Sequence, residues 1–308
     1  MRFTDMADEM FGAAQGALPA GVRLATAKRG GVTITRVEIA REGLAKPRGR
    51  YVTLEMPSVS VLDERDAAVI ETCAAELRAL LPPEGPVLVL GIGNRRVTAD
   101  ALGPRTAQKI LVTMGPQHTL PVKGIRPVAA IAPGVSASTG LTLRQLAGAM
   151  VEAVRPAALI CVDSLCSAEG ARLGRSVQFS DTGLYPAQAD HAKHLDAAAL
   201  GVPVIAAGIP TLMDSDEGAD LVVTPRALDS VIAHGSALLA GAINRALQPR
   251  LGVAPPFWLA GEHRWAGREV ILCAAKHCRP PGRRGISCRF WKRLLCLPHC
   301  ASLPARRH

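Results

Sequence analysis

Short apolar runs alternate along this chain with segments of helical spacing, and this alternation limits the possible folds more than any other feature. Residues 86–90 (PVLVL) are too few for a helix and are followed by a glycine, which is typical of a buried strand. Residues 65–81 have helical apolar spacing and are followed by two prolines. Further strands are predicted at 126–132, 157–162, 203–207 and 220–223, and further helices at 101–112, 141–154 and 226–247. This order predicts an α/β fold with a mostly parallel central sheet and helices on both faces.

The segments before residue 60 have a different pattern. Residues 31–39 and 50–56 alternate β-branched with polar residues, which predicts a hairpin pair or two edge strands. Farther along the chain, Thr139 or Thr142 is expected to open the helix at 141–154, because threonine is a common N-cap.

The net charge of +10 is concentrated at the C-terminal end. Residues 251–308 hold eleven of the 36 Lys and Arg residues but only two of the 26 Asp and Glu residues, together with all three Trp. This break predicts a boundary near Pro249, followed by a divergent, basic, Cys-rich tail at 250–308 that we expect to be disordered. The rest of the chain is nearly neutral, so nucleic-acid binding is expected only of the tail, if anywhere.

Five of the eight cysteines lie in this tail, but their spacing matches no zinc-binding pattern, so no metal site is expected. No apolar run reaches the roughly 18 residues of a membrane span. The start of the chain lacks the basic and apolar regions of a secretory signal. These observations predict a cytoplasmic protein without a membrane partner.

Two aspartates follow predicted buried strands. Asp100 comes shortly after the strand at 86–90, and Asp163 comes directly after the strand at 157–162. Ligands and catalytic groups collect at the carboxyl ends of parallel strands, where two carboxylates can share a proton and perform acid–base chemistry. The alternative is structural: Asp100 caps the helix expected from Ala101, and Asp163 only ends a strand.

Other chemistries find less support. A dinucleotide motif lacks its third glycine and no phosphate loop is present, so no cofactor is expected. A Ser–His mechanism lacks a histidine beside a strand end, because the histidines before the tail are His118, His191, His194 and His234. The turns after two strands contain Gly93, Asn94, Pro133 and Gly134. They form either ordinary tight turns or a rim of backbone N–H groups that binds an extended peptide.

Several segments of this chain together resemble the spore germination protease family, which degrades small acid-soluble spore proteins. The matching segments lie in the family's order within residues 30–248: GRYVTLE, GIGNRRVTADALGPR, RPVAAIAPGVSASTG, ALICVDSLCS, VQFSDTGLYP, LGVPVIAAGIPT and LVVTPRALDSVI. The resemblance implies a fold similar to that of hydrogenase-maturation peptidases. It also implies an atypical aspartic endopeptidase, whose two aspartates fall on Asp100 and Asp163, and it favours the functional interpretation of both residues.

The resemblance carries further expectations. It implies a homo-oligomer, typically a tetramer, in the cytoplasm of the forespore or spore core. Family members are zymogens, so residues 1–30 are expected to be a short prosegment-like region before a peptidase domain at 31–249. The sequence TDMADE resembles the family's cleavage sequence, which makes the bond between Asp5 and Met6 a candidate for self-processing. A long family insertion is missing after Thr211, and the basic tail replaces the family's own C-terminal end.

Two alternatives remain open at the level of sequence. The relation to hydrogenase-maturation peptidases allows a metal-assisted endopeptidase, with Asp100 and Asp163 as oxygen ligands of a hard divalent ion. The other alternative is a protein without enzymatic activity that binds nucleic acid through its basic tail.

Overall fold

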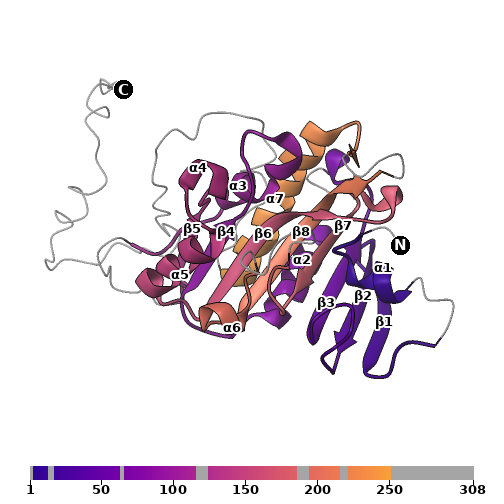
Figure 1. The fold of residues 1–308 in the computed structure, drawn as a ribbon, viewed down its shortest axis with the longest axis horizontal. Coiled ribbons are helices and arrows are strands. Elements are labelled where there is room, and N and C mark those ends of the chain that lie inside the picture. The colour runs from indigo at the N-terminus through magenta and orange to yellow at the C-terminus, as the bar shows by residue number, and fades with distance from the viewer. Residues whose placement is uncertain are drawn as a thin grey trace, which may run out of the picture. The chain divides into compact units, whose positions relative to one another are not determined.

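Apolar side chains on both faces of one mixed β-sheet form the core. The computed structural model describes residues 3–12, 17–62, 66–115, 124–185, 194–215 and 221–250. Its strands are β1 (Val22–Arg29), β2 (Val32–Ile39), β3 (Gly49–Glu55), β4 (Val87–Gly91), β5 (Val128–Ile131), β6 (Ala158–Cys166), β7 (Ser176–Ser180), β8 (Val204–Asp214) and β9 (Val222–Val223). Figure 1 shows the order β5-β4-β6-β8-β7-β3-β2-β1 from left to right, and β9 pairs with β8.

The sheet has a parallel part and an antiparallel part. β5, β4, β6 and β8 run parallel to one another. β7, β3, β2 and β1 continue the sheet in antiparallel pairs, which confirms the predicted hairpin of β2 and β3. The α/β class is confirmed. β6 lies between β4 and β8, so the carboxyl ends of these three parallel strands, where catalytic groups are expected, are neighbours.

Helices cover both faces. They are α1 (Ala7–Gly12), α2 (Ala67–Leu80), α3 (Leu102–Ala107), α4 (Ser136–Thr139), α5 (Leu143–Val154), α6 (Ala197–Leu200) and α7 (Leu228–Leu247), with 3-10 turns η1 (Val59–Val61), η3 (Thr98–Asp100) and η4 (Gly170–Arg172). The apolar residues of α2, α3 and α7 form one cluster with the sheet. Those of α5 and α6 pack on the opposite face, and α1 joins a third cluster with β1, β2 and β3.

Local sequence explains several element boundaries. All five residues of β4 are buried, as expected for a strand covered on both faces. α5 begins with a capping box, in which the Thr142 hydroxyl accepts from the Gln145 N–H and the Gln145 side chain accepts from the Thr142 N–H. Thr142, and not Thr139, is therefore the N-cap.

The predicted helix at 101–112 is shorter in the structure. α3 ends at Ala107, and the chain then turns toward Asn244 of α7. The Asn244 side chain accepts from the Leu111 N–H at 2.8 Å and donates to the Lys109 carbonyl at 3.1 Å. These contacts satisfy backbone groups that would otherwise continue the helix, so a tertiary interaction sets its end.

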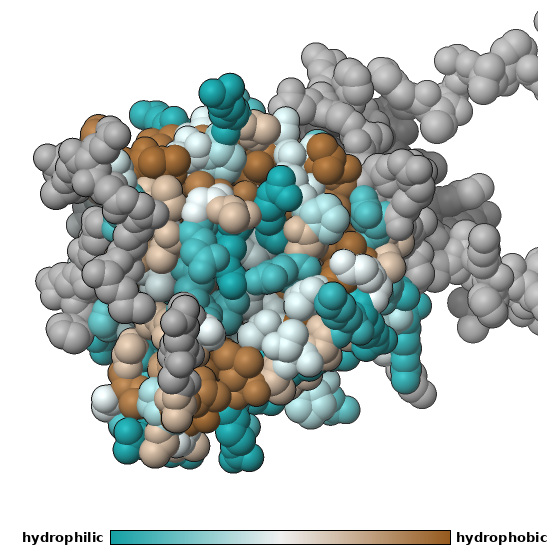
Figure 2. Space-filling view, turned by 90° about the vertical axis from the view of Figure 1, so that its right-hand side faces the viewer, coloured by the Kyte–Doolittle hydropathy of each residue, from teal (hydrophilic) through white to brown (hydrophobic). Residues whose placement is uncertain are grey.

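Both ends of the chain bear on the expected domain boundaries. The boundary expected after residue 30 falls in the turn between β1 and β2, so residues 22–29 are part of the same sheet. β1 is an edge strand of the sheet. Figure 2 shows the side of the molecule on which β1 lies, and hydrophilic residues gather at the centre of this side. Of the tail at 250–308, only Arg250 lies within the described residues. No helix in the described ranges is long and apolar enough to cross a membrane.

Candidate active site

The carboxyl edge of the parallel strands carries Asp163. In β6, Val162 pairs with Gly91, the last residue of β4, so Asp163 is the first residue of β6 to extend past β4. On its other side, Asp163 pairs with Gly208 of β8. Alternation along β6 directs the Asp163 side chain to the face of α5, because Leu159 and Cys161 belong to the cluster on that face.

Asp100 reaches the same edge from the turn after β4. Its Oδ2 accepts a hydrogen bond of 2.6 Å from the Asn94 N–H. Asp100 does not cap α3, since Ala101 holds the N-cap position and makes no side-chain bond there. The turn is fixed from β8 as well, because the Thr211 hydroxyl donates to the Ala99 carbonyl at 2.9 Å.

Two glycines allow this close packing. Gly93 has a φ of +122°, and a Cβ there would lie 2.1 Å from the Asp100 carbonyl oxygen. A Cβ on Gly103 would lie 2.2 Å from the Ile92 carbonyl oxygen and 2.3 Å from that of Val162. Real Cβ atoms do not come so close, so glycine is required at both positions for the Asp100 turn and α3 to approach β4 and β6.

Both carboxyls hold protons more strongly than an ordinary aspartate. Burial raises the pKa of Asp163 well above its usual value, the Asp100 and Asp5 carboxylates raise it further, and the Ser164 N–H opposes them. Burial also raises the pKa of Asp100, against the effect of the Asn94 hydrogen bond. Like charges at one edge favour a state with one proton on the pair. Such a pair can supply one general acid and one general base.

The predicted rim is only partly assembled around this pair. Gly93 and Asn94 contact Asp100 directly, as described above. Pro133 and Gly134 follow β5, on the far side of β4 from β6, and Gly134 has a φ of +84°. Within the described residues, no hydrogen bond joins these two residues to either aspartate.

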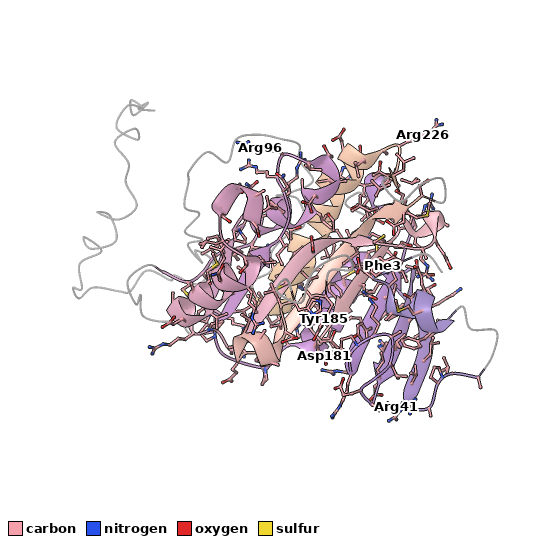
Figure 3. The ribbon with its side chains drawn as sticks, viewed as in Figure 1. Phe3, Arg41, Arg96, Asp181, Tyr185 and Arg226 are labelled. Atoms are coloured by element: carbon pink, nitrogen blue, oxygen red, sulfur yellow. The ribbon has the colours of Figure 1, made fainter. Side chains whose placement is uncertain are left out.

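The N-terminal segment is held against the end of β6. The Asp5 N–H donates to the Cys166 carbonyl at 2.9 Å, and Asp5 Oδ2 accepts from the Cys166 N–H at 2.7 Å. The Gln178 side chain donates to the Asp5 carbonyl and accepts from the Ala7 N–H. Met6 is fully buried. Figure 3 labels Phe3 beside these strands.

Arg172 forms ion pairs with the helix α1, which follows the N-terminal segment. Its guanidinium forms ion pairs with Asp8 at 2.5 Å, Glu9 at 3.5 Å, Glu55 at 2.8 Å and Glu169 at 3.2 Å. These partners lie on α1, on β3 and beside η4. Sequence reasoning missed this arrangement, for which the only signal was the acidic start of α1.

No metal centre is evident among these groups. In the described residues, no three His, Cys, Asp or Glu side chains are arranged to hold a metal ion. Cys161 is fully buried in the core, where burial raises the pKa of its thiol.

Comparisons with known proteins place this geometry in a family. The germination protease family model matches residues 7–217. The germination protease of Clostridium perfringens is 32% identical over 282 residues, covering 71% of this chain and 86% of that protein. The germination protease of Priestia megaterium is 35% identical over 228 residues, covering 70% of this chain and 60% of that protein. The germination protease of Caldanaerobacter subterraneus is 38% identical over 208 residues, covering 63% of this chain and 64% of that protein.

Among solved structures, the hydrogenase maturation protease HycI from Thermococcus kodakarensis is 16% identical, with a TM-score of 0.34. The match covers 55% of this chain and 98% of the HycI chain. The curated relatives and the family model make this α/β protein a protease. It belongs to the germination protease family, whose members act in spore germination.

Proposed function

We propose that this protein is an endopeptidase that begins the degradation of small acid-soluble, DNA-binding spore proteins during germination, and that Asp100 and Asp163 activate the attacking water. The observation that carries the mechanism is the placement of two carboxyls with raised pKa values at the edge of the parallel strands. Family membership supports the choice of substrate.

The two aspartates have different roles. Asp163 is the acid, because burial and the neighbouring carboxylates keep its proton in place. Asp100 is the base, because its pKa is raised less than that of Asp163 and the Asn94 N–H favours its carboxylate form. Asp100 removes a proton from water as the water oxygen bonds to the scissile carbonyl carbon, and Asp163 protonates the carbonyl oxygen. The tetrahedral intermediate then collapses: the C–N bond breaks, the amine takes the proton from Asp100, and a hydroxyl proton returns to Asp163.

Paired amide substitutions test this mechanism. Asp100→Asn and Asp163→Asn each remove one proton-transfer group without changing the side-chain shape, so we expect cleavage of spore-protein substrate to fall by about two to four orders of magnitude. Asp229→Asn is the matched control, because Asp229 is exposed in the first turn of α7. Retained cleavage by both site variants would refute the mechanism. Cleavage that a chelator abolishes would favour the metal-assisted alternative instead.

The proposal includes self-processing at the bond between Asp5 and Met6. The Asp5 carboxylate contributes to the raised pKa of Asp163, which supports a position of this segment close to the catalytic pair. The bond is not ready for cleavage in this conformation, because Met6 is fully buried and the Asp5 carbonyl accepts from Gln178. The segment therefore has to leave these contacts before it can be cut.

Assembly and location follow the family. We propose a homo-oligomer, a tetramer by resemblance, that acts in the forespore and spore core. Light scattering on the purified protein measures the oligomeric state, and a monomer would contradict this part of the proposal.

A further inference from the structure

Ser164, the residue after Asp163, carries a buried hydroxyl without a hydrogen-bond partner. Within the described residues, two buried side-chain polar atoms lack a partner, and these are Ser164 Oγ and His234 Nδ1. Buried hydroxyls are nearly always satisfied in native proteins, and the exceptions concentrate at functional sites. The Ser164 hydroxyl therefore requires an explanation, since it adjoins a proposed catalytic residue.

Ser164 already contacts Asp163 through its backbone. Its N–H donates to Asp163 Oδ1 at 2.8 Å, which brings the carboxyl back toward the start of the Ser164 side chain. Ser164 itself is fixed in β6, where it pairs in register with Ile209 of β8. Alternation points the Ser164 side chain to the opposite face of β6 from Asp163, so the two groups can meet only beside the Ser164 N–H, where Asp163 Oδ1 lies. Rotation about the Ser164 Cα–Cβ bond decides whether the hydroxyl points to that side.

The charge on Asp163 changes during the proposed reaction. Asp163 is protonated in the resting pair and becomes a carboxylate once it has protonated the scissile carbonyl oxygen. The charged groups that face it are Asp100 on η3 and Asp5 on the N-terminal segment, and both disfavour the new charge. The Ser164 N–H is the donor that favours it. A second donor would be useful only after the proton has left.

We propose that Ser164 is a positioning residue whose hydroxyl becomes a second hydrogen-bond donor to the Asp163 carboxylate when that group gives up its proton. The hydroxyl lacks a partner in the resting protein because its partner forms during the reaction. An interaction made only after proton transfer raises kcat without strengthening substrate binding. This inference rests on the proposed function, since it assigns Asp163 as the acid.

The test compares two serines whose hydroxyls are buried. Ser164→Ala removes an unsatisfied hydroxyl, so Tm is expected to be unchanged or higher. The variant is expected to lower kcat about tenfold to hundredfold, as for a hydrogen bond to a charged group, with KM within about twofold. Loss of a donor to the charged form raises the pKa of Asp163, so the alkaline limb of the rate profile moves to higher pH.

Ser236→Ala is the matched control. Ser236 is fully buried in α7, but its hydroxyl donates to the Ala233 carbonyl at 2.9 Å. This variant is expected to keep the kcat and the pH profile of the wild type, with a Tm that is unchanged or lower. Ser164→Thr retains a hydroxyl on the same bond and is expected to restore both kcat and the position of the alkaline limb.

The outcomes separate this inference from the proposed function. Unchanged kcat and an unmoved alkaline limb in Ser164→Ala, while Asp100→Asn and Asp163→Asn abolish cleavage, overturn the role of Ser164 alone. A lower Tm in Ser164→Ala, with no rescue by Ser164→Thr, shows a structural role and also overturns it. Retained cleavage by both aspartate variants overturns the mechanism and the Ser164 role together.

Discussion

Burial of the Asp163 carboxyl opposes folding at neutral pH. Its pKa is raised well above 3.8 in the folded protein, mainly by burial and next by Asp100. The folded state therefore binds this proton more strongly than the unfolded state does. The linked stability is fully present below pH 3.8 and is lost as pH rises through the raised pKa.

Asp163→Asn is consequently expected to stabilise the fold at neutral pH while it abolishes cleavage. Asparagine keeps the oxygen that accepts from the Ser164 N–H but has no charge to bury. About 1 kcal/mol corresponds to roughly 2–4 °C in a protein of this size, so Tm measured at pH 7 should rise detectably. The gain should shrink as pH falls toward 3.8. A Tm at pH 7 equal to or below that of wild type would contradict this prediction.

At the residue scale, sequence patterns located what depends on strand position and missed what depends on distant contacts. Asp163 was found because it directly follows a buried apolar run. No apolar pattern marks β7 as a strand, because Ser176, Gln178 and Ser180 are polar and yet buried. Gln178 and Asp5 are 173 residues apart, and local sequence contains no signal for such a pair.

At the element scale, the position of η3 and of Asp100 depends on how closely α3 packs on β4 and β6. Gly103 lies at this contact, where a Cβ would meet two carbonyl oxygens at 2.2 and 2.3 Å. The direction of the strands belongs to the same scale. A period-two pattern does not encode strand direction, so the sequence predicts only one hairpin of the antiparallel half of the sheet.

Gly103→Ala and Gly148→Ala make a matched pair of helical substitutions with opposite expected signs. In α3, the new methyl at Gly103 clashes with backbone, so we expect the free energy of unfolding to fall by about 3 kcal/mol. We also expect a strong loss of cleavage. In α5, nothing lies within 4 Å of the position of a Cβ on Gly148. The free energy of unfolding of that variant should rise by up to about 1 kcal/mol, because alanine has a higher helix propensity than glycine. Urea unfolding measures both, and a tolerated Gly103→Ala would show that α3 is not held as described.

At the scale of the whole molecule, the N-terminal segment is bound to two strands, β6 and β7, and to the turn η4, all more than 150 residues later in the chain. Cys166, Gln178 and Arg172 all hold residues 4–9 in place. Lys46, from the loop before β3, donates to the Thr4 carbonyl at 3.3 Å. A chain end is commonly loose, but this one is packed into the fold, so any self-processing is controlled by release of the segment.

Arg172→Ala is expected to release this segment. The Arg172 side chain is only 18% exposed, and its removal takes away the guanidinium that pairs with the buried Asp8 and Glu9 carboxylates. Breaking such a buried pair costs about 3 kcal/mol or more. We expect this cost mainly to weaken the attachment of α1 to the rest of the fold. Hydrogen exchange should therefore quicken at the Asp5 and Ala7 amides, which bond to Cys166 and Gln178.

If the segment is a self-processing site, the same release should speed the loss of residues 1–5. Intact-mass spectrometry of Arg172→Ala at mildly acidic pH should show that loss at least about tenfold faster than in wild type, since a shift of 1.4 kcal/mol already corresponds to tenfold. Arg23→Ala is the control, because Arg23 pairs with Glu38 at 3.8 Å on the exposed surface. Adding Asp163→Asn should stop the loss if the protein cuts itself. Faster exchange without any loss of residues 1–5 would show that the segment is released but is not a substrate.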